Sequence, residues 1–549
     1  MAAGMTPERS LRASSAILCL KELELGLLAL IDADYSLRFI DFSNYRLFGG
    51  GTLPLTSQAP QRVDIAYRGN LCLAAEPEGG QAQLYGVKRQ KLLCRVGAHQ
   101  GALSCVAFDP QGRYAVTAGD DGKVAAWEVK SCKRAFNIPS HTDRVEAIAF
   151  SSDGTLVATG GFDRTVQLSK SGTGQHPKML RGHSVAVTAL RFVDDLGLLS
   201  ADKEGQIILW DLHGGILGRL SRTEGEVTAL EYDRETGLLF VATRKGSVSL
   251  YDLESREPVA MRYLSFAEPV SAMAFCAQHR RLAVGTEEGS IHLFAPYADS
   301  DEALSSQDFD ALEGLARHNP ALRFSPHYRV MEEAWKEMEE RIESLIAEDR
   351  PEEALLLLGP YLGVSSRQKR VSELETRLRE YELFREHIRA GRLNIAYDLA
   401  FKTPFFKETA LYRKMESQWR RACEGAAKRL CDRRTEEEGM ALLAPYRGIS
   451  EKTAAIRELI EESKRACYFG ELVGRREWKK ACDIVRHHPQ LQRSDAYKSL
   501  LNVADKLFIS AQKAYSADDY KTAKEACETL LDFPDYKEDA QELLARMKG

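Results

Sequence analysis

The sequence predicts a multidomain chain in which an all-β part, a seven-bladed β-propeller, is followed by an all-α part, an α-helical repeat solenoid. Two observations predict this order. A strand-like pattern recurs seven times in the first 298 residues, and a helix-like pattern of similar period recurs after it. The length of 549 residues agrees with at least two domains, because single hydrophobic cores stop growing at about 250–300 residues.

Seven short segments in the N-terminal part share one pattern, in which alternating apolar residues lead to an aromatic or bulky residue. These key positions are Ile40, Tyr85, Trp127, Ser169, Trp210, Tyr251 and Phe294, with spacings of 45, 42, 42, 41, 41 and 43 residues. A second ladder of apolar segments ends at Tyr67, Phe108, Phe150, Phe192, Tyr232 and Phe275. Turn signals such as DPQG, SSDG and DDG separate the segments, which indicates short antiparallel strands. Repeats of about 40–45 residues with about four strands are typical of propeller blades.

The unit at residues 98–128 resembles the WD40 family. It has a histidine before the first strand, a hydroxyl residue, an aspartate in a tight turn and a tryptophan, which are His99, Thr117, Asp121 and Trp127. In that family the four side chains form a hydrogen-bonded chain that stiffens a blade, so the resemblance implies a structural role for them.

Two further units resemble the family in part. Unit 141–170 keeps His141, Thr159 and Asp163, with Ser169 where a tryptophan is expected. Unit 183–211 keeps His183, Ser200 and Trp210, with Glu204 in place of the aspartate. The remaining units are predicted from periodicity and apolar pattern.

The propeller is expected to occupy residues 1–298. No fourth strand is evident after Phe294, so a closing strand near 10–15 is expected to complete the last blade and remove an exposed sheet edge. Residues 299–326 are acidic and contain several serines, which indicates a linker with one short helix around Phe309–Leu315.

Residues 327–549 predict a solenoid of about five helix pairs, because glycines become sparse and apolar residues recur at intervals of three and four. A small residue recurs in a short apolar helix that ends near a proline, at Ala354, Ala396, Gly439, Ala481 and Ala523, with spacings of 42, 43, 42 and 42 residues. Helix pairs of this kind stack on their neighbours, since one pair cannot bury its apolar stripe alone. The last unit is similar to a tetratricopeptide repeat (TPR), and the longer period makes the solenoid TPR-like.

Composition and charge bound the function. The chain is 44% hydrophobic and 28% charged, as in ordinary soluble proteins. The formal net charge of −5 comes with interspersed signs, so no basic field is present and we do not expect nucleic acid as the main ligand. Lys21, Glu22 and Glu24 interrupt the apolar N-terminal stretch, so we expect neither a signal peptide nor an integral membrane segment. Peripheral membrane association through a partner stays open.

No catalytic residue, metal site or cofactor is predicted. Phosphate-loop, zinc-protease, nucleophile-elbow and kinase motifs are absent from the sequence. The innermost strands carry mainly apolar residues, where an enzyme in the propeller channel would need acidic or histidine residues. The 11 cysteines are scattered and show no CxxC spacing, so we interpret them as reduced, mostly buried thiols of a cytoplasmic protein.

The WD40 resemblance suggests where partners bind. In that family the residue just before the turn aspartate, on the top face, is a frequent contact point. Here these residues are Asp120, Phe162, Lys203 and Arg244, and Arg144 is expected close by in a loop that enters a first strand. Phe162 is the strongest candidate, because an exposed aromatic amid Arg and Lys has the composition of an interface anchor.

The favoured hypothesis is therefore a non-enzymatic interaction scaffold or adaptor that binds other proteins or peptides, with its oligomeric state open. A narrower alternative is a structural subunit of a large assembly, since a propeller followed by a solenoid resembles vesicle-coat and intraflagellar-transport subunits. A substrate receptor for a modifying enzyme is another alternative, which would need a recruiting motif outside the propeller. From a different class, the chain could be a propeller enzyme or small-ligand binder.

Overall fold

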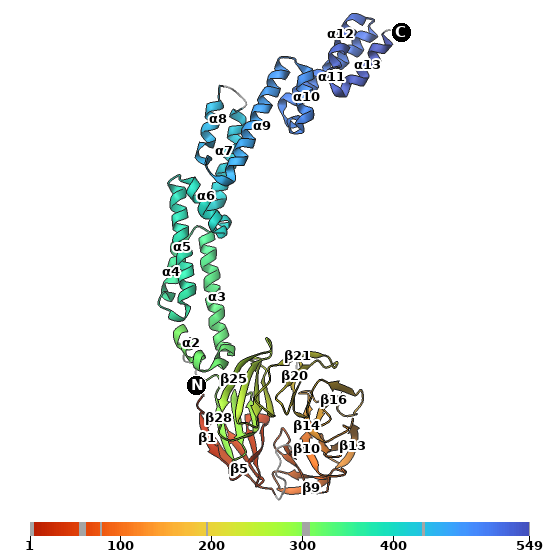
Figure 1. The fold of residues 1–549 in the computed structure, drawn as a ribbon, viewed down its shortest axis with the longest axis vertical. Helices are drawn as coiled ribbons and strands as arrows, with labels where there is room; N and C mark the ends of the chain where they lie inside the picture. Colours follow the sequence, from red (N-terminus) through yellow and green to blue (C-terminus); the bar gives the residue numbers. More distant parts are fainter. Residues whose placement is uncertain are drawn as a thin grey trace. The chain divides into compact units, whose positions relative to one another are not determined.

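The computed structural model describes residues 5–53, 62–76, 79–193, 196–298, 308–430 and 434–547. The chain divides into two compact units, Met1–Trp335 and Lys336–Gly549. Figure 1 shows that the strands belong to the first unit and that the second unit is helical.

The described part of the first unit contains seven four-stranded antiparallel sheets, and the predicted seven-bladed propeller is confirmed. The strands of the first three blades are β2 (Ile17–Glu22), β3 (Leu28–Asp32), β4 (Ser36–Asp41), β5 (Arg46–Thr52), β6 (Val63–Ile65), β7 (Leu71–Ala75), β8 (Ala82–Gly86), β9 (Lys91–Val96), β10 (Leu103–Phe108), β11 (Tyr114–Gly119), β12 (Val124–Glu128) and β13 (Lys133–Ile138). Those of the next three are β14 (Val145–Phe150), β15 (Leu156–Gly161), β16 (Thr165–Lys170), β17 (Lys178–Arg181), β18 (Val187–Val193), β19 (Gly197–Asp202), β20 (Ile207–Trp210), β21 (Ile216–Leu220), β22 (Val227–Asp233), β23 (Leu238–Thr243), β24 (Ser247–Asp252) and β25 (Glu257–Ser265).

The last blade joins the two ends of the propeller. It contains β26 (Val270–Cys276), β27 (Arg281–Thr286) and β28 (Ser290–Phe294), and its outer strand is β1 (Arg9–Arg12), which pairs antiparallel with β28. The closing strand therefore begins one residue before the segment 10–15 in which it was expected. Pairing β1 with β28 leaves the ring without a gap between its first and last blades.

The seven key positions share one register in the third strand of each blade. Each faces a buried residue of the second strand, as Trp127 faces Ala115 and Trp210 faces Leu198. The other pairs are Ile40 with Leu28, Tyr85 with Cys72, Ser169 with Val157, Tyr251 with Leu239, and Phe294 with Leu282. A constant period therefore reflects a constant place in the blade.

One member of the second ladder was wrongly placed. Ile65 pairs with Cys72 as Phe108 pairs with Ala115, so Ile65 and not Tyr67 holds that position. Tyr67 lies after the strand and is exposed. The apolar pattern cannot separate the two residues, because residues two apart in a strand point to the same face.

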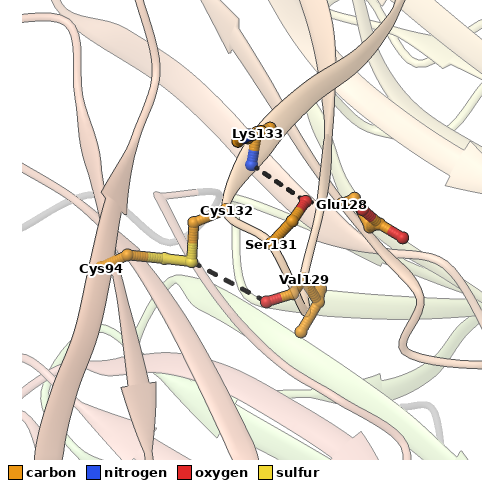
Figure 2. Close-up of a disulfide and its surroundings, with 6 residues drawn as sticks. All are labelled: Cys94, Glu128, Val129, Ser131, Cys132 and Lys133. Atoms are coloured by element: carbon orange, nitrogen blue, oxygen red, sulfur yellow. Dashed lines mark hydrogen bonds between the residues drawn. A yellow bond between two sulfur atoms is a disulfide. The ribbon is translucent and has the colours of Figure 1, made fainter.

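Cys94 and Cys132 form a disulfide, so the expectation that all cysteines are reduced is wrong for this pair. Cys94 lies in β9 of the second blade and Cys132 in the turn before β13 of the third, and the bond joins neighbouring blades (Figure 2). The two cysteines are 38 residues apart in the sequence, and the stacking of neighbouring blades brings them together. Their spacing in the sequence therefore does not indicate the bond. Seven free cysteines among the described residues are Cys19, Cys72, Cys105, Cys276, Cys423, Cys482 and Cys527.

Two short helices follow the propeller within the first unit, α2 (Phe309–His318) and the 3-10 helix η3 (Pro320–Phe324). Residues 299–307 of the expected linker lie outside the described residues. Asn319 attaches this segment to the last two blades, because its amide oxygen accepts a hydrogen bond from the Tyr263 hydroxyl at 2.9 Å and its amide nitrogen donates to the Pro296 carbonyl at 2.8 Å.

Long and short helices alternate in the C-terminal region. The long ones are α3 (Pro326–Ala347), α5 (Gln368–Arg389), α7 (Ala410–Arg429), α9 (Ser450–Gly474) and α11 (Asp495–Ser516). The short ones are α4 (Pro351–Leu358), α6 (Leu393–Lys402), α8 (Glu436–Leu443), α10 (Trp478–His487), α12 (Tyr520–Leu530) and the final α13 (Lys537–Arg546). The predicted helical region is confirmed. In the described part of the chain, no helix combines the length and apolar character needed to cross a membrane.

The recurring small residues lie at helix contacts. The four alanines of the series are fully buried, each in one of the short helices. Gly439 holds the equivalent place in α8, where a Cβ would lie 3.2 Å from the Leu430 backbone nitrogen. Small residues therefore allow close approach of the helices, which is a packing role.

Replacing Cys132 with serine is expected to lower the thermal unfolding midpoint of the propeller, because a disulfide closing a loop of this length stabilises a fold by about 2–4 kcal/mol. Differential scanning calorimetry of the full chain without reductant measures the effect, with Cys423→Ser, a free thiol, as the matched control. Dithiothreitol should lower the midpoint of the wild type and leave Cys132→Ser unchanged. An unchanged wild-type midpoint in dithiothreitol contradicts a stabilising disulfide.

Candidate interaction face of the propeller

A buried chain of hydrogen bonds connects strands and turn in the third blade. The Trp127 indole N–H donates to Thr117 Oγ1 at 3.0 Å, and Thr117 Oγ1 lies 2.9 Å from His99 Nε2. His99 Nδ1 lies 3.0 Å from the Asp121 carboxylate, which also accepts from the backbone N–H of Gln100 at 3.0 Å. Because an indole can only donate, the Thr117 hydroxyl is free to donate to a neutral imidazole, whose Nδ1–H then donates to Asp121.

The fourth blade has the same chain without its tryptophan. His141 Nδ1 lies 3.0 Å from the Asp163 carboxylate, and Nε2 lies 2.8 Å from Thr159 Oγ1. Ser169 is buried at the tryptophan position, and its hydroxyl has no hydrogen-bond partner within the described structure. The turn is still anchored, because the histidine and aspartate remain.

In the fifth blade the aspartate of the chain is Asp202 and not the turn residue Glu204. His183 lies 2.9 Å from Asp202 through Nδ1 and 2.6 Å from Ser200 through Nε2. Ser200 accepts from Trp210 at 2.7 Å. Glu204 is exposed and pairs with Arg222 at 3.2 Å. The expectation that Glu204 replaces the aspartate is therefore wrong.

Asp202 takes the place of the turn aspartate because of the residue type at the end of the second strand. Asp202 faces Val187 in the register in which Gly119 faces Leu103 and Gly161 faces Val145. A Cβ at Gly119 or Gly161 would lie 3.0 Å from the histidine Nδ1 of its blade. The carboxylate thus comes from the turn where the strand ends in glycine, and from the strand end itself in the fifth blade.

The histidine-centred chains lie beside three of the turns that carry candidate partner-binding residues, those of Asp120, Phe162 and Lys203. Asp120, Phe162, Lys203 and Arg244 each donate a backbone hydrogen bond to the loop that enters the first strand of their own blade. The accepting carbonyls are those of Ala102, Arg144, Ala186 and Glu226, at 3.0, 2.8, 3.1 and 2.9 Å. The predicted residues therefore occupy equivalent places in four consecutive blades.

Two of the predicted side chains, Lys203 and Arg144, contact the ring of Phe162, which is half-buried and not exposed as expected. Lys203 Nζ lies 4.0 Å from the ring centroid and the Arg144 guanidinium carbon 5.9 Å from it. Arg144 also pairs with Asp120 at 3.4 Å. Two cations over one ring make favourable cation–π contacts and hold the aromatic side chain in place.

Two acidic residues that the sequence analysis missed complete this surface. Glu146 lies 3.0 Å from Arg144, and Glu226 lies 3.3 Å from Arg244. Burial raises the pKa of Glu146, with Arg144 and Lys203 acting in the opposite direction. We call the surface formed by the five predicted residues with Glu146 and Glu226 the charged rim. Exposed ion pairs contribute about 0–1 kcal/mol to stability, so the pair of Arg244 with Glu226 adds little to folding.

The innermost strands line a central cavity of about 830 Å³. Pairing with the second strands places seven residues at one level of this channel, Lys21, Asp64, Ala107, Ala149, Arg191, Glu231 and Ala274. Lys21 pairs with Asp64 at 2.7 Å, and Arg191 with Glu231 at 3.0 Å. The expectation of mainly apolar inner strands overlooked these charges. Each carboxylate is neutralised by a cation from the neighbouring blade, and no two carboxylates form an acid–base pair at this level.

The part of the chain that the structure describes contains no group of three or more histidine, cysteine, aspartate or glutamate residues that could hold a metal ion.

Comparison with known proteins identifies repeats in the same blades. The family model described as WD domain, G-beta repeat, matches residues 90–128, 131–168 and 174–211. These matches include the three blades with histidine-centred chains. WD repeat-containing protein 55 of Rattus norvegicus and that of Mus musculus are each 28% identical over 122 residues. The match covers 21% of this chain and 30% of the length of each relative.

Asp202→Ala is expected to lower the free energy of unfolding by about 1–3 kcal/mol, because it leaves the buried His183 Nδ1 and the Gln206 backbone N–H without their acceptor. Glu204→Ala is the matched control, and this exposed change should stay within about 0.5 kcal/mol. Urea unfolding of the full chain followed by tryptophan fluorescence measures both. A larger loss in Glu204→Ala than in Asp202→Ala would restore the original assignment.

Acid is expected to destabilise the propeller through the turn aspartates. Burial raises the pKa of Asp163, but hydrogen bonds from His141 and Thr165 outweigh burial and lower it overall. The stabilisation is therefore complete above about pH 4, the ordinary range of an aspartate, and is lost as the pH falls through the lowered pKa of the folded state. The thermal midpoint should fall less steeply between pH 5 and 3 in Asp163→Asn than in the wild type. If the thermal midpoints of the wild type and Asp163→Asn fall equally with pH, Asp163 does not stabilise the folded state in this way.

Proposed function

We propose that this chain, whose seven-bladed propeller contains WD40 repeats, is a non-enzymatic scaffold or adaptor that assembles partner proteins or peptides through the charged rim and the helical solenoid. The observation that carries the proposal is the position of Phe162 between Lys203 and Arg144, on turns anchored by buried hydrogen-bond chains. A rigid body that presents several turns side by side suits protein recognition.

The composition of the charged rim supports a protein or peptide partner. Aromatic and arginine side chains supply most hot spots in protein interfaces, and Phe162 and Arg144 are adjacent here. Acidic residues interrupt the cations, because Asp120 and Glu146 both contact Arg144. A nucleic acid backbone would favour an uninterrupted basic surface, so we infer that nucleic acid is not the main ligand.

The channel supports a role without catalysis or cofactor. Its charges at one level are paired between neighbouring blades, Lys21 with Asp64 and Arg191 with Glu231. Burial raises the pKa of Glu231, but the Arg191 guanidinium acts in the opposite direction and pairs with that carboxylate. We infer that these paired charges are contacts that join the blades.

The solenoid supplies the second proposed binding surface. Its alternating helices repeat a TPR-like pattern, and stacked repeats of this kind offer extended surfaces for helices or peptides. The cytoplasm is the proposed location, because the propeller cysteines Cys19, Cys72, Cys105 and Cys276 are free thiols. The Cys94–Cys132 disulfide is the exception to that pattern.

The double variant Phe162→Ala with Lys203→Glu is expected to weaken partner binding by about 2 kcal/mol or more, roughly thirtyfold, because it removes the aromatic anchor and reverses one of its cations. Affinity purification of the full chain from its native cell with mass spectrometry identifies stoichiometric partners, and titration measures their affinity.

The matched control is Met179→Ala with Lys178→Glu, on the outer strand β17 away from the turns. This variant should keep its partners. The scaffold proposal fails if no partner copurifies with the intact chain while that chain turns over a metabolite. The rim assignment fails if both double variants bind the partners equally well.

A further inference from the structure

An apolar groove lies between the short helix α4 and the long helix α5 of the second unit. Its cavity has a volume of about 830 Å³. Leu355 from α4 and Leu383 from α5 line it and are 54% and 48% exposed, and the buried Leu378 lies between them as its floor. Leu356, next on α4, is 79% exposed. Exposed leucines gathered in one groove are characteristic of an interaction site.

The lining of this groove is strongly acidic. Four carboxylates line it, Glu352, Glu375, Glu382 and Glu386, against one guanidinium, Arg379, which pairs with Glu375 at 3.9 Å. Arg385 lies nearby and pairs with Glu352 at 2.6 Å and with Glu382 at 3.3 Å. Glu386 is not among the carboxylates that Arg385 binds. The groove therefore combines an apolar floor with a negative edge, although the whole chain carries a formal net charge of only −5.

We propose that the α4–α5 groove binds an amphipathic helix of a partner protein, with apolar side chains against Leu355 and Leu383 and basic side chains against the acidic edge. The inference deepens the scaffold function proposed above and rests on it. A helix lying along two packed helices places its residues i, i+3, i+4 and i+7 in the groove, which is a common mode of peptide recognition. Lysine or arginine beside those positions complements the glutamates.

Charge also disfavours a second copy of this chain as the occupant. A symmetric dimer through this groove would place the same surface on both sides. Each copy would bring its four carboxylates to the interface, and like charges brought together there cost several kcal/mol. A basic helix meets no such repulsion.

The test uses two synthetic helical peptides with the same leucine stripe, one flanked by lysines and the other by glutamates. Fluorescence anisotropy with the full chain is expected to show binding of the lysine-flanked peptide, weakening with added salt because the attraction is between exposed charges. The glutamate-flanked peptide should bind at least about tenfold more weakly.

Variants locate the binding site. Leu383→Ser and Glu386→Lys should each weaken binding of the lysine-flanked peptide by about tenfold, and Glu386→Lys should reduce its salt dependence. The matched controls are Ile509→Ser, which replaces an exposed apolar residue of α11, and Glu525→Lys in α12; both should bind as the wild type does. Circular dichroism verifies that each variant keeps its helices.

Several outcomes overturn the inference. Equal affinity for the two peptides, no binding of either, or wild-type affinity in Leu383→Ser and Glu386→Lys each contradicts it. Light scattering that shows a wild-type dimer reduced to monomer by Leu383→Ser assigns the groove to a second copy instead. If the groove binds neither peptide, the scaffold proposal still stands as long as partner binding depends on Phe162 and Lys203. Loss of the scaffold proposal would appear separately, as the absence of copurifying partners.

Discussion

The pairing of β1 with β28 is the constraint on which the propeller depends. Residues at the N-terminal end of the ring complete the blade formed nearly 300 residues later, with Arg9 opposite Leu293 and Arg12 opposite Ser290. Glu8 adds an ion pair with Arg281 at 2.7 Å, and the Ser271 hydroxyl of the last blade donates to the Ile17 carbonyl of the first at 2.7 Å. A closed ring fixes each blade between two neighbours, which keeps the channel charges and the turns of the charged rim in register.

The sequence predicted the blades well and individual side-chain partners less well. Periodicity predicts the blades because every key position faces the equivalent position of the second strand in its blade, as Trp127 faces Ala115 and Trp210 faces Leu198. Glu204 precedes Trp210 by the same spacing as Asp121 precedes Trp127. The hydrogen bond to the histidine depends instead on whether the end of the strand leaves room beside the imidazole. Asp202 stands where the third blade has Gly119, and this aspartate in place of a glycine could have indicated the true partner of His183. The Cys94–Cys132 bond had no such signal, because it joins two blades whose stacking the sequence does not describe.

Prediction of the two surfaces was limited in different ways. The family resemblance selected the four turn residues, and the structure added Glu146, the second residue of β14, and Glu226, which directly precedes β22. In the solenoid, the run PEEALLLL has the composition of a core helix, but only Leu358 of its leucines is buried. This helix of eight residues packs through Pro351, Ala354 and Leu358, and Leu355 and Leu356 remain exposed. Excess apolar residues in so short a helix therefore mark a surface that periodicity would assign to the core.

The central claim is that this propeller recognises partners through the charged rim. Hydrogen–deuterium exchange on the complex isolated from native cells, compared with the free chain, tests it most directly. The account predicts slower exchange in peptides that cover residues 143–146, 161–164, 202–205 and 243–246, with the outer strands of the same blades unchanged. Unchanged exchange in all four segments, with protection confined to other surfaces of the propeller, contradicts the claim.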